Sequence, residues 1–399
     1  MDSISIHLPA SKSISNRVLI LNALTNWKLN LINLSEAQDT KDLYVCLQSD
    51  KEILDIGEGA TSLRFLLAFL CYENQVKTIF CGPSLKIRPI QTLLRVLNEF
   101  HCEFEYLEEN GKLPVKIVQG IHGNYPEEIQ IDTSISSQFV SAMLLIAPYL
   151  KSGLKIQFTN QMVSKPYIDM TLKLMQHFGV QFIKNVSSIQ VFSGKYQMPE
   201  YRIESDWSSA SFFYAWLALQ DSGSMYFPGL KMSGMQGDEV VASFFLNFGI
   251  ESIIEADGIH IIKNESVLPE AIDFDFTNCP DLFPPICMFC AIRKIISTFR
   301  GLQHLVHKES NRLKILNDFL SVQSVEIELY ENDSKQLTGF YRMDLFNSNI
   351  EKLYSSHMDH RIAMAFSLLN VIRKIEIVNP EVVNKSFPGY WEAFNKVCK

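Results

Sequence analysis

The sequence predicts an α/β (α+β) protein built from a repeated unit of helices and strands. The chain has 399 residues, of which 47% are hydrophobic, so it can form large cores in two or three domains. An amphipathic helix, a short stop, a strand, a turn and a second strand recur along it. The four helix ends, at His101, Gly179, Gly249 and Ser321, lie 78, 70 and 72 residues apart. This period is too long for a solenoid of short repeats and indicates a βαβαββ unit used several times.

Each copy of the repeat follows from its own residue pattern. Apolar residues at helical spacing predict helices, and short apolar or alternating runs predict strands. Gly179 and Gly249 stand where a helix end favours a positive φ. Asn110-Gly111 and Asp257-Gly258 are typical of two-residue hairpins. In chain order, the predicted helices and strands are 93–100, 103–106 and 115–118; 172–178, 180–183 and 189–192; 244–248, 253–254 and 259–262; and 313–320 with 325–329.

A polar string containing Lys or Arg precedes an apolar helix at several places. A helix N-terminus presents unpaired N–H groups and a partial positive charge, so it is suited to bind an anion. Added basic side chains indicate a pocket for several negative groups at once, whereas one copy alone is explained equally well as a capped helix start. The strings are Ser11-Lys12-Ser13-Ile14-Ser15-Asn16-Arg17, Arg88-Pro89-Ile90, Ser164-Lys165-Pro166-Tyr167 and Lys308-Glu309-Ser310-Asn311-Arg312.

The composition excludes several classes of partner. The net charge of −8 argues against a nucleic-acid or membrane-surface protein, because both usually carry a basic face. The apolar runs fall short of the ~20 residues that a membrane span needs. The first eight residues lack a basic segment followed by an apolar core, so we expect a cytoplasmic protein that acts on small molecules.

The eight cysteines do not form a recognisable framework. Only Cys287 and Cys290 are closely spaced, and they lie in the apolar stretch 285–292. A zinc or redox site would need a second ligand pair or a thioredoxin-like context. Buried, reduced thiols explain the pair better. We therefore expect no metal and no cofactor.

The polar strings belong to a larger ordered set, and that set resembles the enolpyruvyl transferases. Each motif alone is weak, but eleven in the same order over nearly the whole chain are very specific. They are Pro9-Ala10-Ser11-Lys12-Ser13-Ile14-Ser15-Asn16-Arg17, Gly59-Ala60-Thr61-Ser62-Leu63-Arg64, Arg88-Pro89-Ile90, Ser136-Ser137-Gln138-Phe139, Ser164-Lys165-Pro166-Tyr167-Ile168-Asp169, Ser205-Asp206-Trp207-Ser208-Ser209-Ala210-Ser211, Gln236-Gly237-Asp238, Pro280-Asp281, Lys308-Glu309-Ser310-Asn311-Arg312-Leu313, Asp359-His360-Arg361-Ile362-Ala363-Met364 and Lys385-Ser386-Phe387-Pro388-Gly389-Tyr390.

The resemblance implies a two-domain inside-out α/β barrel. Each domain would be built from three βαβαββ-type units, with helices inside and sheets outside. One domain would comprise residues 1–10 and 205–399, and the other would be an insertion of residues 11–204. The active site would lie in the interdomain cleft and close when substrate binds. The family is commonly monomeric, so by analogy we expect a monomer.

The resemblance also implies a reaction. The enolpyruvyl group of phosphoenolpyruvate would move to the 5-hydroxyl of shikimate 3-phosphate with release of phosphate, a step of the shikimate pathway toward chorismate and the aromatic amino acids. Asp281 would take the proton from the 5-hydroxyl, and Glu309, with Lys12, would move protons at the methylene carbon. Taken alone, Asp281 could equally be a turn residue after Pro280.

The substrate ligands implied by the resemblance fall into two sets. Lys165 and Tyr167 are second choices for the first set, and Asp359 and His360 would orient Arg361 and its loop. For shikimate 3-phosphate the ligands are Lys12, Ser13, Arg17, Ser136, Ser137, Gln138, Ser164, Asp281, His304 and Lys308. For phosphoenolpyruvate they are Lys12, Ala60, Arg88, Gln138, Arg312, Arg361 and Lys385.

The chain departs from the family pattern at three places. The common Gly-Asn-Ala-Gly-Thr is Gly57-Glu58-Gly59-Ala60-Thr61 here, which adds a methyl group at Ala60 and a charge at Glu58. Glyphosate is longer than phosphoenolpyruvate and occupies its pocket, so we expect it to bind poorly. The segment 42–57 is short, which indicates that a strand pair of one unit is missing. His304 stands where some relatives have Asn.

Two other functions fit the same motifs less well. A UDP-N-acetylglucosamine enolpyruvyl transferase shares the fold and phosphoenolpyruvate, but its reactive loop cysteine has no convincing counterpart here. A non-catalytic binding protein on the same scaffold would not need Lys12, Asp281 and Glu309. Phosphate release measured with each acceptor distinguishes these alternatives.

Overall fold

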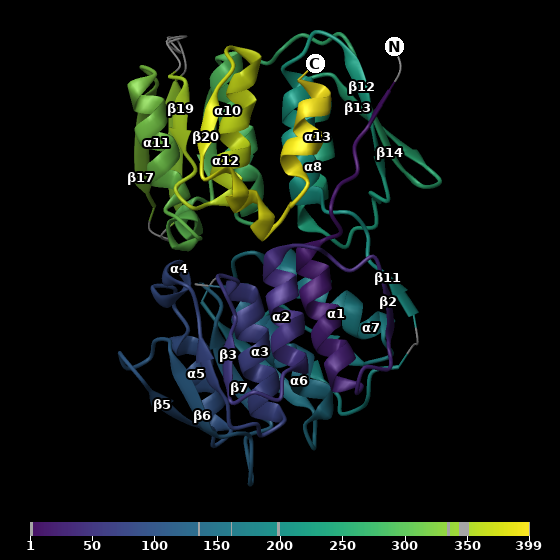
Figure 1. The fold of residues 1–399 in the computed structure, drawn as a ribbon, viewed down its shortest axis with the longest axis vertical. Coiled ribbons are helices and arrows are strands. Elements are labelled where there is room, and N and C mark those ends of the chain that lie inside the picture. Colours follow the sequence, from purple (N-terminus) through teal and green to yellow (C-terminus); the bar gives the residue numbers. More distant parts are fainter. Residues whose placement is uncertain are drawn as a thin grey trace. The chain divides into compact units, whose positions relative to one another are not determined.

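The computed structural model describes residues 3–134, 136–160, 162–197, 200–332, 336–342 and 351–398. It divides into two compact units (Figure 1). Unit 1 comprises Met1–Ala10 with Glu204–Lys399, and unit 2 comprises Ser11–Ile203. The chain therefore leaves unit 1 after Ala10 and re-enters it at Glu204, one residue before the boundary expected from the sequence.

Unit 2 contains two four-stranded sheets and one two-stranded sheet in its described residues. The first sheet has the order β3 (Ile53–Asp55), β4 (Thr78–Phe80), β6 (Val115–Gln119) and β5 (Glu103–Tyr106). The second has the order β7 (Glu128–Asp132), β8 (Leu154–Thr159), β10 (Ser188–Val191) and β9 (Phe182–Lys184). The short sheet pairs β11 (Glu200–Arg202) with β2 (Asn30–Ile32).

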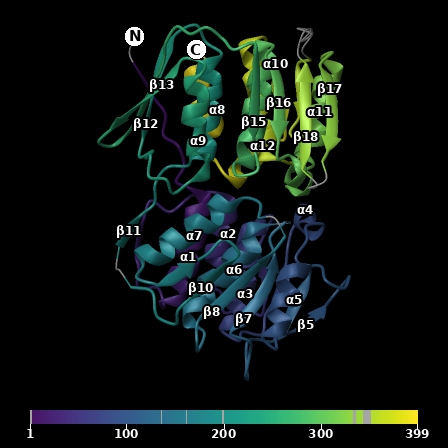
Figure 2. The same cartoon turned by 180° about the vertical axis from the view of Figure 1, so that it is seen from behind.

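Unit 1 repeats this arrangement. Its first sheet has the order β1 (Ile4–Ser5), β12 (Gly223–Pro228), β14 (Gly258–Lys263) and β13 (Ile250–Glu255). The second, drawn in green at the upper right of Figure 2, has the order β15 (Ala271–Asp275), β16 (Ile296–Arg300), β18 (Leu337–Arg342) and β17 (Glu326–Glu331). The short sheet pairs β19 (Leu353–Ser355) with β20 (Glu376–Val378).

All four large sheets share one pairing pattern. The first two strands are parallel, and the remaining pairs are antiparallel. A parallel pair needs a crossover connection, which a helix supplies, whereas the last two strands form a hairpin. This is the βαβαββ unit that the sequence predicts, so the α/β class and its repeat are confirmed. In the described residues, no strand pairing closes the sheets of a unit into one barrel.

The helices supply the core. In unit 2 they are α1 (Lys12–Leu24), α2 (Gln38–Gln48), α3 (Ala60–Tyr72), α4 (Pro83–Lys86), α5 (Gln91–Glu99), α6 (Ser137–Ile146) and α7 (Lys165–His177). In unit 1 they are α8 (Trp207–Ala218), α9 (Val240–Leu246), α10 (Phe283–Arg293), α11 (Arg312–Val322), α12 (His360–Ser367) and α13 (Tyr390–Val397). Every residue of α8 is buried, whereas the strands alternate buried and exposed positions. The helices therefore lie inside and the sheets outside, as expected.

Helix-to-helix packing holds each core together. In unit 2, α3 packs on α1, α2 and α6, and α6 packs on α7. In unit 1, α10 packs on α8 and α12, and aromatic rings of α8 meet those of α13 at Trp216–Phe394 and Phe212–Tyr390. In the described part of the chain, no helix has the length and apolar character needed to cross a membrane.

Some turns differ from the sequence prediction. Gly179 and Gly249 have φ values of 86° and 78°, as predicted. Asn110-Gly111, however, lies in the long connection between β5 and β6 rather than in a two-residue turn. The register pairs Glu255 with Gly258, so the second turn is Ala256-Asp257 and Gly258 already belongs to β14. Positive φ after α11 occurs at Ser324, because Ser321 is still helical.

The short segment of unit 2 has a simple form. Only residues 49–52 connect α2 to β3, and they contain no strand. The sheet formed by β11 and β2 accordingly lacks the hairpin that completes each four-stranded sheet. This agrees with the missing strand pair predicted between residues 42 and 57.

Candidate functional site

The first turns of α1 carry Lys12, Ser13 and Arg17. The basic string lies inside the helix rather than before it, because α1 begins at Lys12 with Ser11 at its N-cap. The Lys12 ammonium donates to Asp39 Oδ2 at 2.8 Å and keeps 19% of its side chain exposed. Ser13 is half-buried, and its carbonyl accepts a hydrogen bond from Arg17 Nη1 at 2.7 Å. Lys12 is thus a positioned donor that a ligand can still reach.

Arg17 is a buried cation that makes no ion pair with a carboxylate in the described residues. It is 1% exposed, and Nε donates to Thr171 Oγ1 at 2.7 Å while Nη2 donates to the Tyr167 carbonyl at 3.1 Å. Its guanidinium carbon lies 5.2 Å from the centroid of the Phe65 ring. Burial lowers the pKa of Arg17 to about 10, so it remains positive at neutral pH. A buried charge without a counter-charge is costly, and an anionic ligand would supply that counter-charge.

The start of α6 brings Ser136, Ser137 and Gln138 to one helix N-terminus. Ser136 is the N-cap, and its hydroxyl accepts a hydrogen bond from the Gln138 N–H at 3.2 Å. The capping explanation therefore holds for Ser136, and a capped N-terminus also suits an anion. The side-chain oxygen of Gln138 accepts a hydrogen bond from Arg64 Nη1.

Ala60 and Arg64 lie one turn apart on α3. Ala60 is the first residue of this helix and is 4% exposed. Arg64 is 2% exposed, and Nη2 donates to the carbonyl of Pro89 at 2.9 Å. Arg88, the neighbour of Pro89, is half-buried. Burial, with a smaller contribution from the charge of Arg88, lowers the pKa of Arg64 well below its usual value.

Ser164 and the two second-choice residues lie at the start of α7. Ser164 is the N-cap, with a φ of 54°, and is buried. Lys165 pairs with Asp169 Oδ2 at 2.7 Å and is mostly exposed, which favours a surface charge. Tyr167 contacts Arg17 through its carbonyl and places its ring centroid 6.0 Å from that guanidinium carbon.

Glu58 turns toward the start of α4. Its carboxylate accepts a hydrogen bond from the Ser84 hydroxyl and a second one from the Ser84 N–H at 3.4 Å. The added negative charge is therefore held by Ser84. This gives a physical account of a substitution that the sequence alone left unexplained.

In unit 1, Asp281 lies among three cations. It belongs to the 3₁₀ turn Pro280–Leu282 that precedes α10. Oδ1 accepts from Arg312 Nη1 at 2.9 Å and lies 3.7 Å from Lys308 Nζ, and Oδ2 accepts from Arg361 Nη2 at 3.0 Å. The side chain remains 14% exposed. These contacts fix the orientation of a carboxylate that is still open to a substrate.

Asp359 forms the second carboxylate contact of Arg312. It is the N-cap of α12, and its two oxygens accept from Arg312 Nε at 2.8 Å and Nη2 at 3.2 Å. Burial alone would raise the pKa of Asp359, but Arg312 holds it below the usual value. Burial would lower the pKa of Arg312, but Asp359 and Asp281 raise it. The pair is thus a bidentate ion pair in which both groups are charged.

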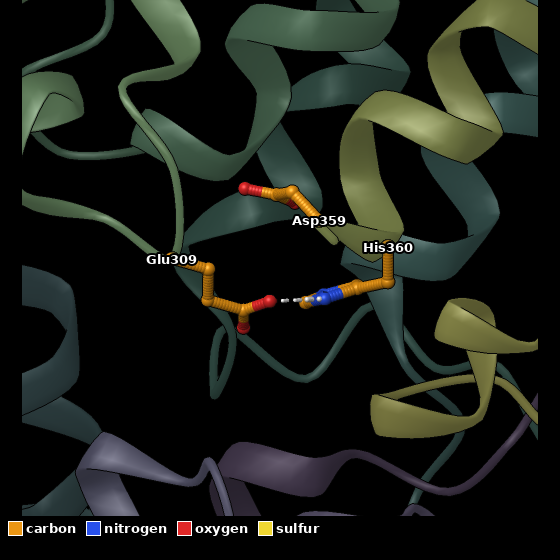
Figure 3. Close-up of side chains that lie close together, drawn as sticks. All are labelled: Glu309, Asp359 and His360. Carbon is orange, nitrogen blue, oxygen red and sulfur yellow. Dashed lines mark hydrogen bonds and ion pairs between the residues drawn. The ribbon is translucent and has the colours of Figure 1, made fainter. Parts of the chain in front are cut away.

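Glu309 and His360 face each other beside this pair (Figure 3). His360 Nδ1 lies 3.0 Å from Glu309 Oε2, and Lys385 Nζ lies 3.7 Å from the same oxygen. Glu309, Asp359 and His360 could together offer ligands to a metal ion. However, Arg312 already neutralises Asp359, and Lys385 lies beside Glu309. The arrangement therefore suits proton transfer better than cation binding.

His304 and Lys308 complete this cluster. His304 is buried, and burial together with the Lys308 charge lowers its pKa to about 3, so the imidazole is neutral. It can therefore offer one donor and one acceptor. Lys308 keeps 22% of its side chain exposed.

Three buried residues that the sequence did not assign belong to these clusters. Arg64 and Asp238 lie inside two of the eleven family motifs, and only this location in the sequence could have suggested a functional role. Asp238 accepts a hydrogen bond from the Ser208 hydroxyl, and burial with the charge of Asp281 raises its pKa to about 7. Nothing in the sequence indicated a role for Asp39, because its role depends on the contact with Lys12, which is 27 residues away in the chain.

The predicted residues thus gather into one cluster in each unit. In unit 1, Asp281 contacts Lys308, Arg312 and Arg361, while Glu309 contacts Lys385. In unit 2, Arg17 joins α1 to α6 and α7 through Ser141 and Thr171, and Arg64 joins Gln138 to the segment of Arg88. Each cluster combines helix N-termini with Lys or Arg, which is the composition expected for binding phosphate and carboxylate groups.

Comparison with known proteins agrees with this chemistry. Residues 43–394 match the family model described as EPSP synthase (3-phosphoshikimate 1-carboxyvinyltransferase). A Bacteroides fragilis protein named 3-phosphoshikimate 1-carboxyvinyltransferase is 36% identical over 396 residues, covering 98% of this chain and 94% of that protein. A Pasteurella multocida protein of the same name is 30% identical over 426 residues, with 98% and 94% covered.

The fold is also similar to solved structures. An EPSP synthase from Acinetobacter baumannii superposes with a TM-score of 0.71 at 19% sequence identity, covering 99% of this chain and 96% of that one. A second structure from the same organism gives a TM-score of 0.69. The family model and the relatives show that the chain belongs to the EPSP synthase (3-phosphoshikimate 1-carboxyvinyltransferase) family of transferases.

Proposed function

We propose that the chain transfers the enolpyruvyl group of phosphoenolpyruvate to the 5-hydroxyl of shikimate 3-phosphate and releases phosphate. The observation that carries this proposal is Asp281, an accessible carboxylate oriented by Arg312 and Arg361. Both substrates carry a phosphate and a carboxylate, so the site needs cations, and the acceptor hydroxyl needs a base. The unit 1 cluster supplies both kinds of group.

In this proposal, unit 2 binds most of shikimate 3-phosphate. Arg17 and the starts of α6 and α7 offer a buried cation, hydroxyls and unpaired N–H groups, which are suitable donors to a phosphate. Lys12 serves both substrates and exchanges Asp39 for a ligand oxygen. Ser13, Ser137, Gln138, Ser164, His304 and Lys308 complete the acceptor site.

The phosphoenolpyruvate ligands come from both clusters. Arg312 and Arg361 present planar guanidinium groups, which bind carboxylate and phosphate bidentately. Lys385 and Arg88 add charge, and Ala60 borders the site. We propose that the groups of both units serve this one pair of substrates.

Proton transfer is assigned to two carboxylates. The 5-hydroxyl must lose a proton, which Asp281 accepts. The methylene carbon of phosphoenolpyruvate must gain a proton and lose it again as phosphate leaves, which Glu309 and Lys12 carry out. The contacts of Glu309 with His360 and Lys385 support this role, because they couple it to two further proton-bearing groups.

The UDP-N-acetylglucosamine alternative is not favoured. That reaction would require a reactive thiol on a loop. Cys81, which is half-buried near Glu58, is the thiol to compare with this requirement. Burial and the Glu58 charge raise the pKa of Cys81 to about 11, so it stays a protonated thiol at neutral pH. A reactive cysteine has the opposite shift.

Phosphate release tests the proposal. Phosphoenolpyruvate is incubated with the protein and either shikimate 3-phosphate or UDP-N-acetylglucosamine, and free phosphate is measured. Release with only the first acceptor supports the proposal. Release with only the second assigns the chain to the alternative reaction, and silence with both, in folded protein, indicates a binding protein.

We further propose that the protein works as a monomer in the cytoplasm. All eight cysteines are free, and six of them, all except Cys81 and Cys398, are buried, which suits a reducing compartment. Sedimentation of the purified protein tests the monomer.

A further inference from the structure

Arg64 is the buried cation of unit 2 that no substrate role explains. It is 2% exposed, and no carboxylate pairs with it in the described residues. Its partners are two neutral oxygens and the Phe139 ring, whose centroid lies 4.8 Å from the guanidinium carbon. Its Nε atom is buried without a hydrogen-bond partner in the same residues. A buried charge with so little compensation destabilises the fold. The role of Arg64 therefore depends on the groups that accept its hydrogen bonds.

The first of these groups is the side-chain amide of Gln138. A guanidinium has only donors, so the atom that faces Arg64 Nη1 must be the amide oxygen of Gln138. The amide nitrogen then points away from Arg64, and no described residue accepts a hydrogen bond from it. Gln138 is half-buried at the start of α6, so this nitrogen offers two N–H donors beside a helix N-terminus. Arg64 therefore selects the amide orientation that suits an anion.

The second group is the backbone beside Arg88. Arg64 Nη2 donates to the Pro89 carbonyl at 2.9 Å, in the segment between α4 and α5. The same guanidinium thus connects two segments that are 49 residues apart in sequence, Pro89 and Gln138. Both segments carry proposed ligands of phosphoenolpyruvate. A side chain with a single point of charge could not make both contacts in this geometry.

We propose that Arg64 is a positioning residue for phosphoenolpyruvate, which holds the Gln138 amide with its N–H groups toward the anion and fixes the backbone that carries Arg88. The ligand identity rests on the proposed function, whereas the positioning role rests on the contacts of Arg64 alone. Arg64 acts through Gln138 and Arg88 and is not itself a catalytic residue.

Substitution Arg64→Lys tests this role, because it keeps the positive charge but loses the planar fork. We expect the KM for phosphoenolpyruvate to rise roughly ten- to a hundredfold, the range for loss of a hydrogen bond to a charged group, with a much smaller change in kcat. In the Gln138→Ala background the same substitution should raise KM far less, because the amide it orients is gone. Arg293→Lys is the matched control, since Arg293 also donates to backbone carbonyls, of Ala218 and Gln220, in unit 1.

A second measurement does not depend on turnover. Hydrogen exchange is compared for the amides of 86–92 and 136–142 in the wild type, Arg64→Lys and Arg64→Met. Faster exchange in both segments of either folded variant, with Arg293→Lys unchanged, supports the positioning role even if the wild type fails to release phosphate. Unchanged exchange together with an unchanged KM overturns it. Equal KM effects of Arg64→Lys with and without Gln138 would also overturn the part played by the amide.

Discussion

The two units use buried arginines in opposite ways. In unit 1, Arg312 lies between Asp359 and Asp281, and Arg361 shares Asp281, so the guanidinium charges are compensated by carboxylates. In unit 2, Arg17 and Arg64 are equally buried but contact hydroxyls, carbonyls, an amide oxygen and ring faces. The buried arginines of the first cluster therefore have carboxylate partners, whereas those of the second have none in the described residues.

This difference suits the two clusters to different roles. A compensated network holds fixed geometry without a ligand, which suits groups that must meet a reacting atom. An uncompensated cation is stabilised when an anion arrives, which suits a binding site. Ligand binding should therefore stabilise unit 2 more than unit 1.

The largest expected effect tests whether both clusters serve one reaction. Lys12→Met in unit 2 and Asp281→Asn in unit 1 should each lower kcat by roughly 10²- to 10⁴-fold, the usual contribution of a general acid or base. The rate of phosphate release with both substrates is the measurement. Lys314→Met and Asp318→Asn are matched controls, since this exposed pair lies on α11. Unchanged turnover in either site variant would remove that unit from the reaction.

The next effect concerns stability and separates the two kinds of arginine. Arg312→Met leaves Asp359 buried without its counter-charge, which costs about 3–5 kcal/mol. Arg17→Met removes a charge that has no counter-charge. This variant should therefore lose clearly less free energy of unfolding than Arg312→Met. Urea unfolding of both variants measures the difference. Equal losses would show that Arg17 is compensated in solution.

The next prediction concerns the methyl group of Ala60 in unit 2. Ala60 places a methyl group at the start of α3, where we expect it to exclude the longer glyphosate. Ala60→Gly should strengthen glyphosate inhibition by roughly 10- to 200-fold, the range for one methylene in a pocket. Inhibition constants measured in competition with phosphoenolpyruvate give the answer. Tight inhibition of the unsubstituted protein would contradict the prediction.

The smallest effect is a pH dependence confined to unit 1. Burial and Asp281 raise the pKa of Asp238 from an ordinary value of 3.8 to about 7. The folded state therefore binds this proton more tightly, and the associated stability is present below pH 3.8 and lost as the pH rises through about 7.

Substitution Asp238→Asn should remove that loss. The variant should be more stable than the wild type at pH 8, by on the order of 1 kcal/mol or more, and similar to it near pH 4. Thermal or urea unfolding at both pH values measures this. Asp257→Asn, in an exposed turn, is the control, and an equal difference at both pH values would contradict the prediction.

Local sequence rules predicted the parts of the fold that depend on neighbours along the chain. Gly179 and Gly249 marked helix ends, because positive φ after a helix favours glycine. The hairpin turn predicted at Asp257-Gly258 was displaced by one position. The strand register, and not the glycine, sets the turn at Ala256-Asp257. Asn110-Gly111 failed for a similar reason, since β5 and β6 pair only beyond a longer loop.

The candidate site shows the same division. Charged motif residues such as Arg17 and Asp281 were predictable, because their residue types match the anions and protons of the implied chemistry. Their partners were not, because Asp39, Arg64 and Ser84 acquire roles only through contacts between residues 25 to 74 positions apart in the chain. Glu58 is the clearest case, since its effect on the site depends on Ser84.

The position of β1 has a consequence for biosynthesis. This strand is made before unit 2, yet its partner β12 follows only after the whole of unit 2, with Ile4 aligned to Met225. All strands of unit 2 pair within Ser11–Ile203, so this inserted unit can fold on the ribosome while β1 waits without a neighbour. Once unit 2 has folded, the Ala10–Ser205 bridge can bring the two crossings of the chain together, but unit 1 must still wait for β12 to be made. During translation, the nascent protein thus carries a folded unit 2 before unit 1 can be completed.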